Sequence, residues 1–162
     1  MTKSTRADNR FVMPRRVEFV DTDMAGIVHF TAFFRYMETA EHELFRTLGL
    51  SLVDMQSDPP LGWPRVSCGF DFLRPLRYQD AFEVHIGVAH ISRSSITYEA
   101  DIMRDGKTLA RGHSTSACCA VGPGSEIRPV PIPDEIRAKL QHYLISTPRT
   151  EPKQSGKTME GR

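Results

Sequence analysis

Residues 20–50 read VDTDMAGIVHFTAFFRYMETAEHELFRTLGL, and this stretch decides the fold. After its first ten residues, apolar side chains recur at intervals of three and four, the spacing that places them on one face of an α-helix. These residues are Phe30, Phe33, Phe34, Met37, Ala40, Leu44, Phe45 and Leu48. Gly49 follows them, as glycine often follows a helix end. The pattern predicts a long amphipathic helix that needs a large apolar surface against it.

The rest of the chain supplies strands for that surface. Residues 11–20 alternate as a half-buried strand, with Val17 and Phe19 on its buried side. Four more runs have a period of two: residues 65–73, 81–91, 95–104 and 108–121. Short turns at residues 93–94 and 105–106 separate the last three runs, and the Asp-Gly of the second turn is typical of a hairpin. The four runs are therefore predicted to pair antiparallel, as a meander.

The predicted fold class is α+β: a five-stranded antiparallel sheet wrapped around one long central helix, followed by a short C-terminal helix. The short helix is expected over residues 135–144, directly after Pro133 and Asp134. The folded domain is expected to span residues 11–145. Residues 1–10 are expected to form a flexible N-terminus, and the polar residues 146–162 a disordered tail.

Composition excludes several classes of protein. The net charge of +1 argues against a nucleic-acid partner, and the absence of a long apolar run argues against membrane insertion. The N-terminus lacks the apolar region of a signal peptide, so we expect a cytoplasmic location. Cys68, Cys118 and Cys119 are odd in number and lack C-x-x-C spacing, which predicts buried free thiols rather than disulfides or a zinc site.

Three motif-like stretches do not carry the chemistry that they suggest at first. The D-x-D of Asp21 and Asp23 begins like a calcium loop, but alanines stand where further oxygen ligands are needed. His42-Glu43 begins a zinc-protease motif, but Arg46 replaces the second histidine. Residues 112–116, GHSTS, lack the second glycine of a serine-hydrolase elbow. No metal site is predicted.

The two aspartates therefore need another explanation. Aspartate often caps the turn before a helix, and this role suits Asp21, the first residue of the turn. Asp23 lies seven residues before Phe30, where the helix is expected to begin with free N–H groups. A helix N-terminus polarises a carbonyl oxygen, and a nearby carboxylate attacks the carbonyl carbon or activates water. Both halves of an acyl-transfer site thus lie in one short segment.

Three segments carry a resemblance to a known family. Residues 17–50 contain D-x-D-x-x-G-I-V followed by the long helix, residues 70–80 read FDFLRPLRYQD, and residues 128–133 read RPVPIP. In this order they resemble hotdog-fold acyl-CoA thioesterases of the 4-hydroxybenzoyl-CoA thioesterase type, over residues 17–144. The resemblance implies hydrolysis of an acyl- or aroyl-CoA thioester in a homodimer or tetramer with active sites at the subunit interface. Coenzyme A enters only as part of the substrate, and no cofactor is implied.

The resemblance also implies roles for individual residues. Asp23 is the catalytic carboxylate, as nucleophile or as general base, and the N–H of Phe30 polarises the thioester carbonyl. His29 and Glu38 match positions that can face the acyl pocket. His29 can equally be a packed residue at the surface edge, and a helical glutamate such as Glu38 more commonly faces solvent. Arg93 lies in the turn where relatives hold the coenzyme A phosphates, but here it stands alone between serines. Arg74, Arg77, Arg104 and Arg128 are further candidates for this contact.

The acyl group is expected to be aromatic or of medium length. Trp63, together with Phe33, Phe34 and Met37, could line an aromatic pocket, or these side chains could simply form the core. Two alternative functions stay open. One is a non-catalytic acyl-CoA-binding protein of the same fold. The other is an enoyl-CoA hydratase, which the spacing of five residues between Asp23 and His29 disfavours, since the hydratase branch has four.

Overall fold

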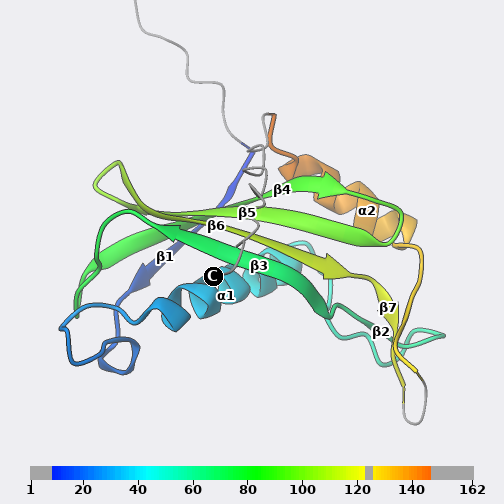
Figure 1. Cartoon of the computed structure of the whole chain (residues 1–162). Coiled ribbons are helices and arrows are strands. Elements are labelled where there is room, and N and C mark those ends of the chain that lie inside the picture. Colours follow the sequence, from blue (N-terminus) through cyan, green and yellow to red (C-terminus); the bar gives the residue numbers. More distant parts are fainter. Residues whose placement is uncertain (1–8, 123–125, 147–162) are drawn as a thin grey trace, which may run out of the picture.

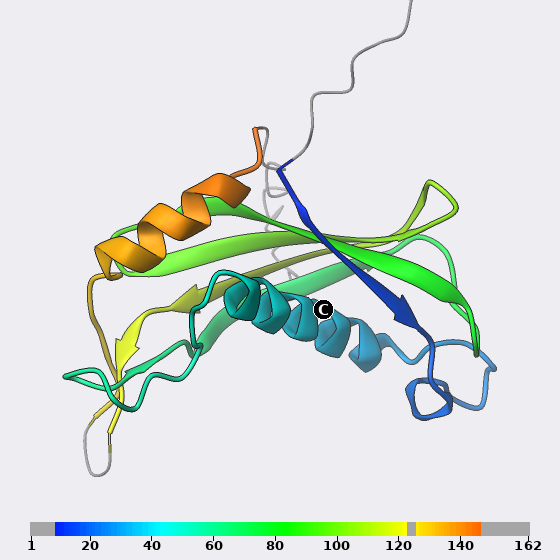
Figure 2. The ribbon, with the colours of Figure 1, turned by 180° about the vertical axis from the view of Figure 1, so that it is seen from behind.

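The long helix lies in the hollow of a curved antiparallel sheet (Figures 1 and 2). The structure, a computed structural model, describes residues 9–122 and 126–146. The helix is α1, Phe30–Thr47, and the five-stranded sheet has the order β1-β4-β5-β6-β3. Its strands are β1 Phe11–Arg16, β3 Arg65–Phe72, β4 Ala81–Ile91, β5 Ser95–Arg104 and β6 Lys107–Ala117. The predicted fold class is confirmed.

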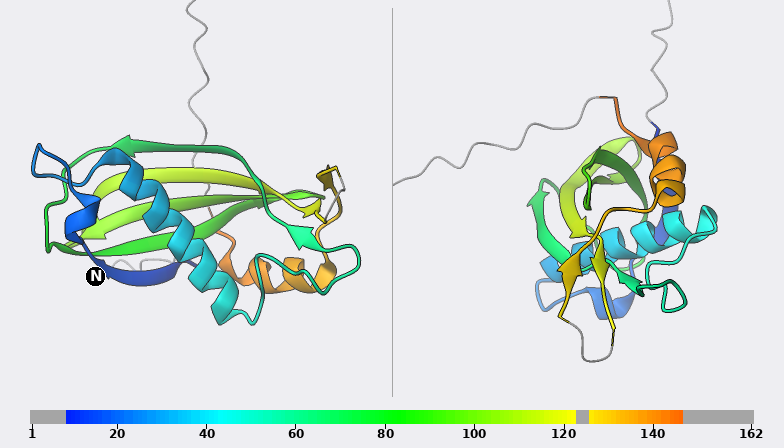
Figure 3. Two further views of the ribbon diagram at one scale, coloured as in Figure 1. Left: turned by 90° about the horizontal axis from the view of Figure 1, so that it is seen from below. Right: turned by 90° about the vertical axis from the view of Figure 1, so that its right-hand side faces the viewer.

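Smaller elements close the end of the sheet where α1 ends. A three-stranded sheet pairs β2 with β7 and β7 with β8, and a short helix, α2, follows (Figure 3). Their bounds are β2 Leu61–Gly62, β7 Cys119–Ala120, β8 Arg128–Pro129 and α2 Asp134–Leu140. After α2, the N–H of Ile145 donates to the carbonyl oxygen of Val88 in β4 (3.0 Å). Gly87 permits this contact, because a Cβ there would lie 2.5 Å from Ile145 Cγ2.

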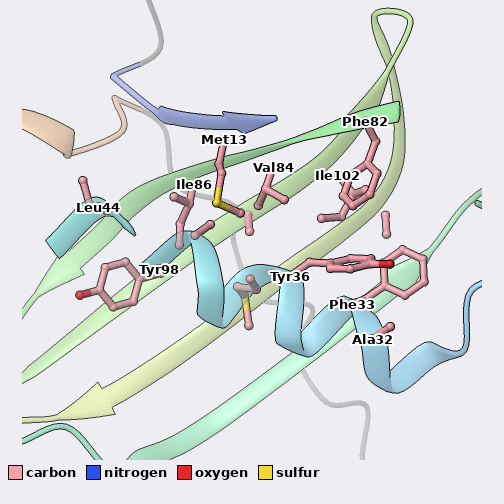
Figure 4. Packing of buried hydrophobic residues seen from close by; sticks show 14 of the residues in the cluster. Met13, Ala32, Phe33, Tyr36, Leu44, Phe82, Val84, Ile86, Tyr98 and Ile102 are labelled. Carbon is pink, nitrogen blue, oxygen red and sulfur yellow. The ribbon is translucent and has the colours of Figure 1, made fainter. Parts of the chain in front are cut away.

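The core lies between the apolar face of α1 and the inner face of the sheet (Figure 4). Tyr36, Met37, Leu44 and Phe45 of α1 are almost fully buried. The sheet contributes alternate side chains, as a pleated surface requires. They include Val84, Ile86, Ile96, Tyr98, Ala100 and Ile102. No helix in the described part of the chain is long and apolar enough to cross a bilayer.

The predicted helix and strands agree closely with the structure. Gly49 has φ +67°, the left-handed conformation expected of a residue that follows a helix. The strands at 81–91 and 95–104 have the predicted bounds, while the run at 108–121 is divided between β6 and β7. The predicted helix at 135–144 ends at Leu140 and continues as a 3-10 turn, Gln141–Tyr143. Apart from residues 9, 10 and 146, the expected flexible ends lie outside the described residues.

Three expectations were wrong. The strand predicted over 11–20 stops at Arg16, and Phe19 is exposed in a 3-10 turn, because the chain turns there towards α1. The four later strands do not form a simple meander: β3 pairs with β6 rather than β4. Strand β4 already has β1 and β5 on its two sides, so the far edge is the place left for β3. Of the cysteines, Cys118 and Cys119 are buried, but Cys68 on β3 is exposed.

Candidate active site

Asp21 fixes the segment between β1 and α1 to the body of the protein. Its side chain is buried, and Oδ1 accepts a hydrogen bond from Nη2 of Arg35 (2.7 Å). Oδ2 accepts from the hydroxyl of Tyr36 (2.8 Å) and from the N–H of Glu18 (3.0 Å). The carbonyl oxygen of Asp21 accepts from the N–H of His29 (2.8 Å). The Asp21 carboxylate thus accepts a backbone N–H of the 3-10 turn, as the sequence suggested, and also ties this segment to α1.

The Asp23 side chain stabilises the turn that follows it, a role that the sequence also suggested for Asp21. Its Oδ1 accepts from the N–H of Ala25 (2.8 Å), and its carbonyl oxygen accepts from the N–H of Gly26 (3.0 Å). Gly26 has φ +73°, which favours glycine. Asp23 is exposed, and its Oδ2 has no hydrogen-bond donor within residues 9–122 and 126–146. One carboxylate oxygen thus fixes the side chain while the other is available.

The beginning of α1 lies next to this turn. His29 is the N-cap residue, and its Nδ1 accepts from the N–H of Thr31 (3.3 Å). The imidazole also lies 4.6 Å from the ring of Phe30, centroid to centroid. Phe30 is the first helical residue, and among the residues described its N–H has no acceptor. A helix N-terminus with a free N–H group favours a negatively charged or strongly polarised oxygen.

Asp23 and Phe30 line the same cavity, which has a volume of about 490 Å³. The wall is completed by Ile27, Val28, Phe33, Phe72, Leu73, Arg74 and Pro75. The segment after β3 is held against the turn, since the N–H of Val28 donates to the carbonyl oxygen of Leu76 (2.8 Å). The cavity combines an apolar, aromatic wall with one carboxylate and one arginine. Such an arrangement suits an acyl group whose carbonyl meets the helix N-terminus.

The other predicted site residues lie elsewhere in the chain. Trp63 packs edge-to-face on Phe45, near the end of α1, with ring centroids 5.9 Å apart. Glu38 is exposed on α1, and its Oε1 lies 3.8 Å from Nη2 of Arg65. Arg93 lies in the β4–β5 turn, at the opposite end of β4 from Ala81, which pairs with Arg16 shortly before Asp23. Within one chain, therefore, the fold brings together Asp23 and Phe30, with His29 beside them.

Sequence reasoning missed a buried ion pair beneath the helix. The carboxylate of Glu41 is buried, and its Oε2 lies 2.6 Å from Nη1 of Arg65, which also donates to Oγ of Ser114 (2.6 Å). Burial raises the pKa of Glu41, and the Arg65 guanidinium partly offsets this effect. Burial, and then the Glu41 charge, raise the pKa of Tyr98. The signal in the sequence was an acid on the apolar face of the helix, four residues after Met37 and four before Phe45.

Comparison with known proteins identifies the family of the chain. The family model described as "Thioesterase-like superfamily" matches residues 17–140 of the chain. The acyl-CoA thioesterase YbgC of Haemophilus influenzae is 27% identical over 135 residues, covering 83% of this chain and 97% of that protein. The crystal structure of Slr0204, a 1,4-dihydroxy-2-naphthoyl-CoA thioesterase from Synechocystis, has a TM-score of 0.74 at 25% identity and covers 82% of this chain and 96% of that one. The BH1999 gentisyl-coenzyme A thioesterase has a TM-score of 0.70 at 26% identity, with coverage of 80% and 99%.

Proposed function

Because the chain belongs to the thioesterase-like superfamily, we propose that it hydrolyses an acyl- or aroyl-CoA thioester to the free acid and coenzyme A, with Asp23 as its catalytic carboxylate. The observation that carries this proposal is the shared cavity of Asp23 and Phe30. A carboxylate and a helix N-terminus are the two groups that thioester hydrolysis needs in the absence of a triad.

In the proposed mechanism the thioester carbonyl oxygen accepts a hydrogen bond from the N–H of Phe30. Asp23 then acts in one of two ways. It removes a proton from a water molecule that attacks the carbonyl carbon, or it attacks the carbon itself to give an anhydride that water cleaves. In both cases the carbon–sulfur bond breaks and coenzyme A leaves as a thiolate, which then takes up a proton. A thiolate is a good leaving group, so strong acid assistance is not required.

We favour an aromatic acyl group. The rings of Phe30, Phe33 and Phe72 all border the cavity, and those of Phe33 and Phe72 lie 5.1 Å apart in an edge-to-face arrangement. Flat aromatic groups pack well against such walls. Two similar structures are of enzymes whose names specify hydroxylated aromatic acyl groups, 1,4-dihydroxy-2-naphthoyl and gentisyl.

The proposed assembly is a homodimer, alone or paired into a tetramer. Strand β3 forms an edge of the sheet, and its Val66 and Cys68 are exposed. An open edge of this kind invites pairing with another strand. If two copies of β3 pair antiparallel, the Arg65 end of one lies against the Phe72 end of the other. Glu38 and Trp63 of a second copy would then approach the Asp23 cavity, which accounts for their distance from it within one chain.

A cytoplasmic location is part of the same proposal. Cys68, Cys118 and Cys119 are free thiols, as is usual in a reducing compartment. The proposed acyl-CoA substrate and the free thiols are both consistent with a cytoplasmic location. Expression with a fluorescent tag in fractionated cells tests this location, and recovery in the periplasm would contradict it.

The function is tested by hydrolysis of a panel of acyl- and aroyl-CoA esters by wild type and by Asp23→Asn. We expect turnover to fall by about 10²- to 10⁴-fold, the range for loss of a general base, while coenzyme A binding is retained. The matched control is Asp105→Asn, because Asp105 is an exposed turn residue with φ +50°, a conformation that asparagine tolerates.

Three outcomes of this experiment oppose the proposal. A wild type that binds these esters without hydrolysing them would indicate a non-catalytic acyl-CoA-binding protein. Addition of water across crotonyl-CoA would indicate an enoyl-CoA hydratase. Full activity of Asp23→Asn would remove Asp23 from the mechanism, since an amide is not a general base.

A further inference from the structure

One wall of the Asp23 cavity is backed by a cluster of aromatic rings. Phe33 of α1 and Phe72 of β3 belong to this wall, with ring centroids 5.1 Å apart. Phe70, two residues before Phe72 on β3, stacks on it with centroids 6.0 Å apart and an angle of 19° between the ring planes. The ring of Phe70 also lies 5.9 Å from that of Phe33. Phe70 is not itself a lining residue, so it supports the wall from behind.

A smaller cavity, of about 120 Å³, lies on the other side of Phe70. The side chains of Cys68, Phe70 and Phe72 share the face of β3 that is turned towards α1, because alternate residues of a strand share a face. Phe72 borders the Asp23 cavity, and Cys68 borders the smaller one. Phe34 of α1 also borders the smaller cavity and packs edge-to-face on Phe70, with centroids 5.2 Å apart. Phe70 therefore separates the two cavities in the groove between α1 and β3.

Gly112 of β6 gives the Phe70 ring its space. The two residues are paired, and a Cβ at Gly112 would lie 2.4 Å from Cζ of Phe70. The ring thus packs on the backbone of β6 and against Phe33 and Phe34 of α1, which hold it in place. All of these residues belong to one chain. Pairing of β3 with a second copy would use the backbone groups of its edge, so the wall does not depend on assembly.

The acyl group is the part of the substrate that meets this wall. Coenzyme A is polar and extends to solvent, whereas the rings of Phe30, Phe33 and Phe72 suit an apolar group. An acyl chain whose carbonyl lies at the N–H of Phe30 therefore ends against Phe33 and Phe72, with Phe70 behind them. The depth available to the acyl group is limited by side chains, which a single substitution can alter.

We propose that Phe70 sets the maximum length of the acyl group by closing the groove between α1 and β3. With its ring in place, the site holds a compact acyl group. Without the ring, the two cavities join into one groove that follows α1 as far as Cys68. This inference rests on the proposed function and adds a specificity-determining residue to the same site.

Phe70→Ala tests the proposal with coenzyme A thioesters of benzoate, hexanoate and dodecanoate. We expect kcat/KM for dodecanoyl-CoA to rise at least about tenfold relative to benzoyl-CoA, because each newly buried methylene group adds about fourfold. Phe70→Leu keeps apolar bulk and should keep the wild-type ratio. Should Phe70→Ala not fold, Phe70→Val, whose branched side chain favours a strand, is expected to change the ratio in the same direction.

The matched control is Phe11→Ala. Phe11 is also a partly buried phenylalanine packed against the core, but it lies on β1, the opposite edge strand of the sheet. Its removal should leave the ratio of dodecanoyl-CoA to benzoyl-CoA activity unchanged. An unchanged ratio in Phe70→Ala, or an equal change in Phe11→Ala, overturns the proposal. A wild type that already prefers dodecanoyl-CoA to benzoyl-CoA also overturns it, although the thioesterase would stand.

A titration that needs no turnover separates this inference from the proposed function. The free acids are the expected products, so dodecanoate and benzoate are titrated into each variant in a calorimeter. We expect Phe70→Ala to bind dodecanoate at least about tenfold more tightly than wild type, with benzoate binding changed less. If wild type hydrolyses none of the thioesters, the proposed function fails, and the titration still decides whether Phe70 limits the cavity. Equal binding of dodecanoate by wild type and Phe70→Ala contradicts the inference alone.

Discussion

The hydroxyl of Tyr36 donates a hydrogen bond of 2.8 Å to Oδ2 of Asp21, and both side chains are buried. Burial, and then the hydrogen bond to Asp21, raise the pKa of Tyr36, so the phenol keeps its proton. The pair joins α1 to the segment that carries Asp23. The position of the candidate catalytic carboxylate therefore depends on a buried contact two residues earlier in the chain.

Replacing Tyr36 by phenylalanine should loosen this connection. We expect Tyr36→Phe to lower the free energy of unfolding by about 2 kcal/mol, because a buried hydrogen bond to a charged group is lost. Urea unfolding measures the change. Arg35→Ala is the comparison, since the Arg35 side chain is more than half exposed and its ion pair with Asp21 should contribute less. A larger loss of unfolding free energy in Arg35→Ala than in Tyr36→Phe would show that the hydrogen bond of Tyr36 contributes less than the ion pair of Arg35.

Glu41 should give stability a specific dependence on pH. Burial raises the pKa of its carboxyl above the ordinary value of 4.5, so the folded chain holds this proton to a higher pH than the unfolded chain does. The stabilisation from this proton is complete below pH 4.5 and is lost as pH rises through the folded pKa. The free energy of unfolding of wild type minus that of Glu41→Gln should therefore fall as pH rises from 4.5.

Urea unfolding over a series of pH values checks this dependence. Glu38→Gln serves as the control, because Glu38 lies 3.8 Å from the same arginine but is exposed. The free energy of unfolding of wild type minus that of Glu38→Gln should not fall comparably as pH rises. A flat difference for Glu41→Gln would contradict the raised pKa.

Gly26 and Gly49 offer a matched pair for testing the turn around Asp23. Both have positive φ, +73° and +67°, and a Cβ would find space at either position. We expect Gly26→Ala and Gly49→Ala each to destabilise the fold by about 1 kcal/mol through backbone strain. Gly26→Ala alone should also reduce kcat, because its turn positions the Asp23 side chain. Equal kinetic effects of the two changes would mean that the turn geometry does not matter.

The open edge of β3 predicts how assembly can be blocked. A lysine at an edge strand opposes pairing between chains, so Val66→Lys should give a monomer in sedimentation and should lose most thioesterase activity. Val53→Lys is the control, because Val53 is exposed to a similar degree, 60% against 62%, but lies outside the large sheet. An active oligomer of Val66→Lys would place the subunit interface elsewhere.

Much of the fold followed from the sequence. The helix over Phe30–Thr47 and the strands β4 and β5 were predicted almost residue by residue. The resemblance to hotdog thioesterases was confirmed by the family match and the structural neighbours. The roles of Asp23, Phe30, His29, Glu38, Trp63 and Arg93 stay predictions. Helix and strand periods could be recognised because each arises from residues close together in the chain.

Only the tertiary structure decided which distant segments meet. It placed β3 beside β6, brought Phe72 and Pro75 into the cavity of Asp23, and put Trp63 and Arg93 at the opposite end. It also gave the buried role to Asp21 and the turn to Asp23, although both are aspartates two residues apart. The alternation of side chains along a strand indicates which of its faces is buried. Which strands become neighbours depends on the packing of the whole sheet around α1, and a local sequence pattern does not contain that information.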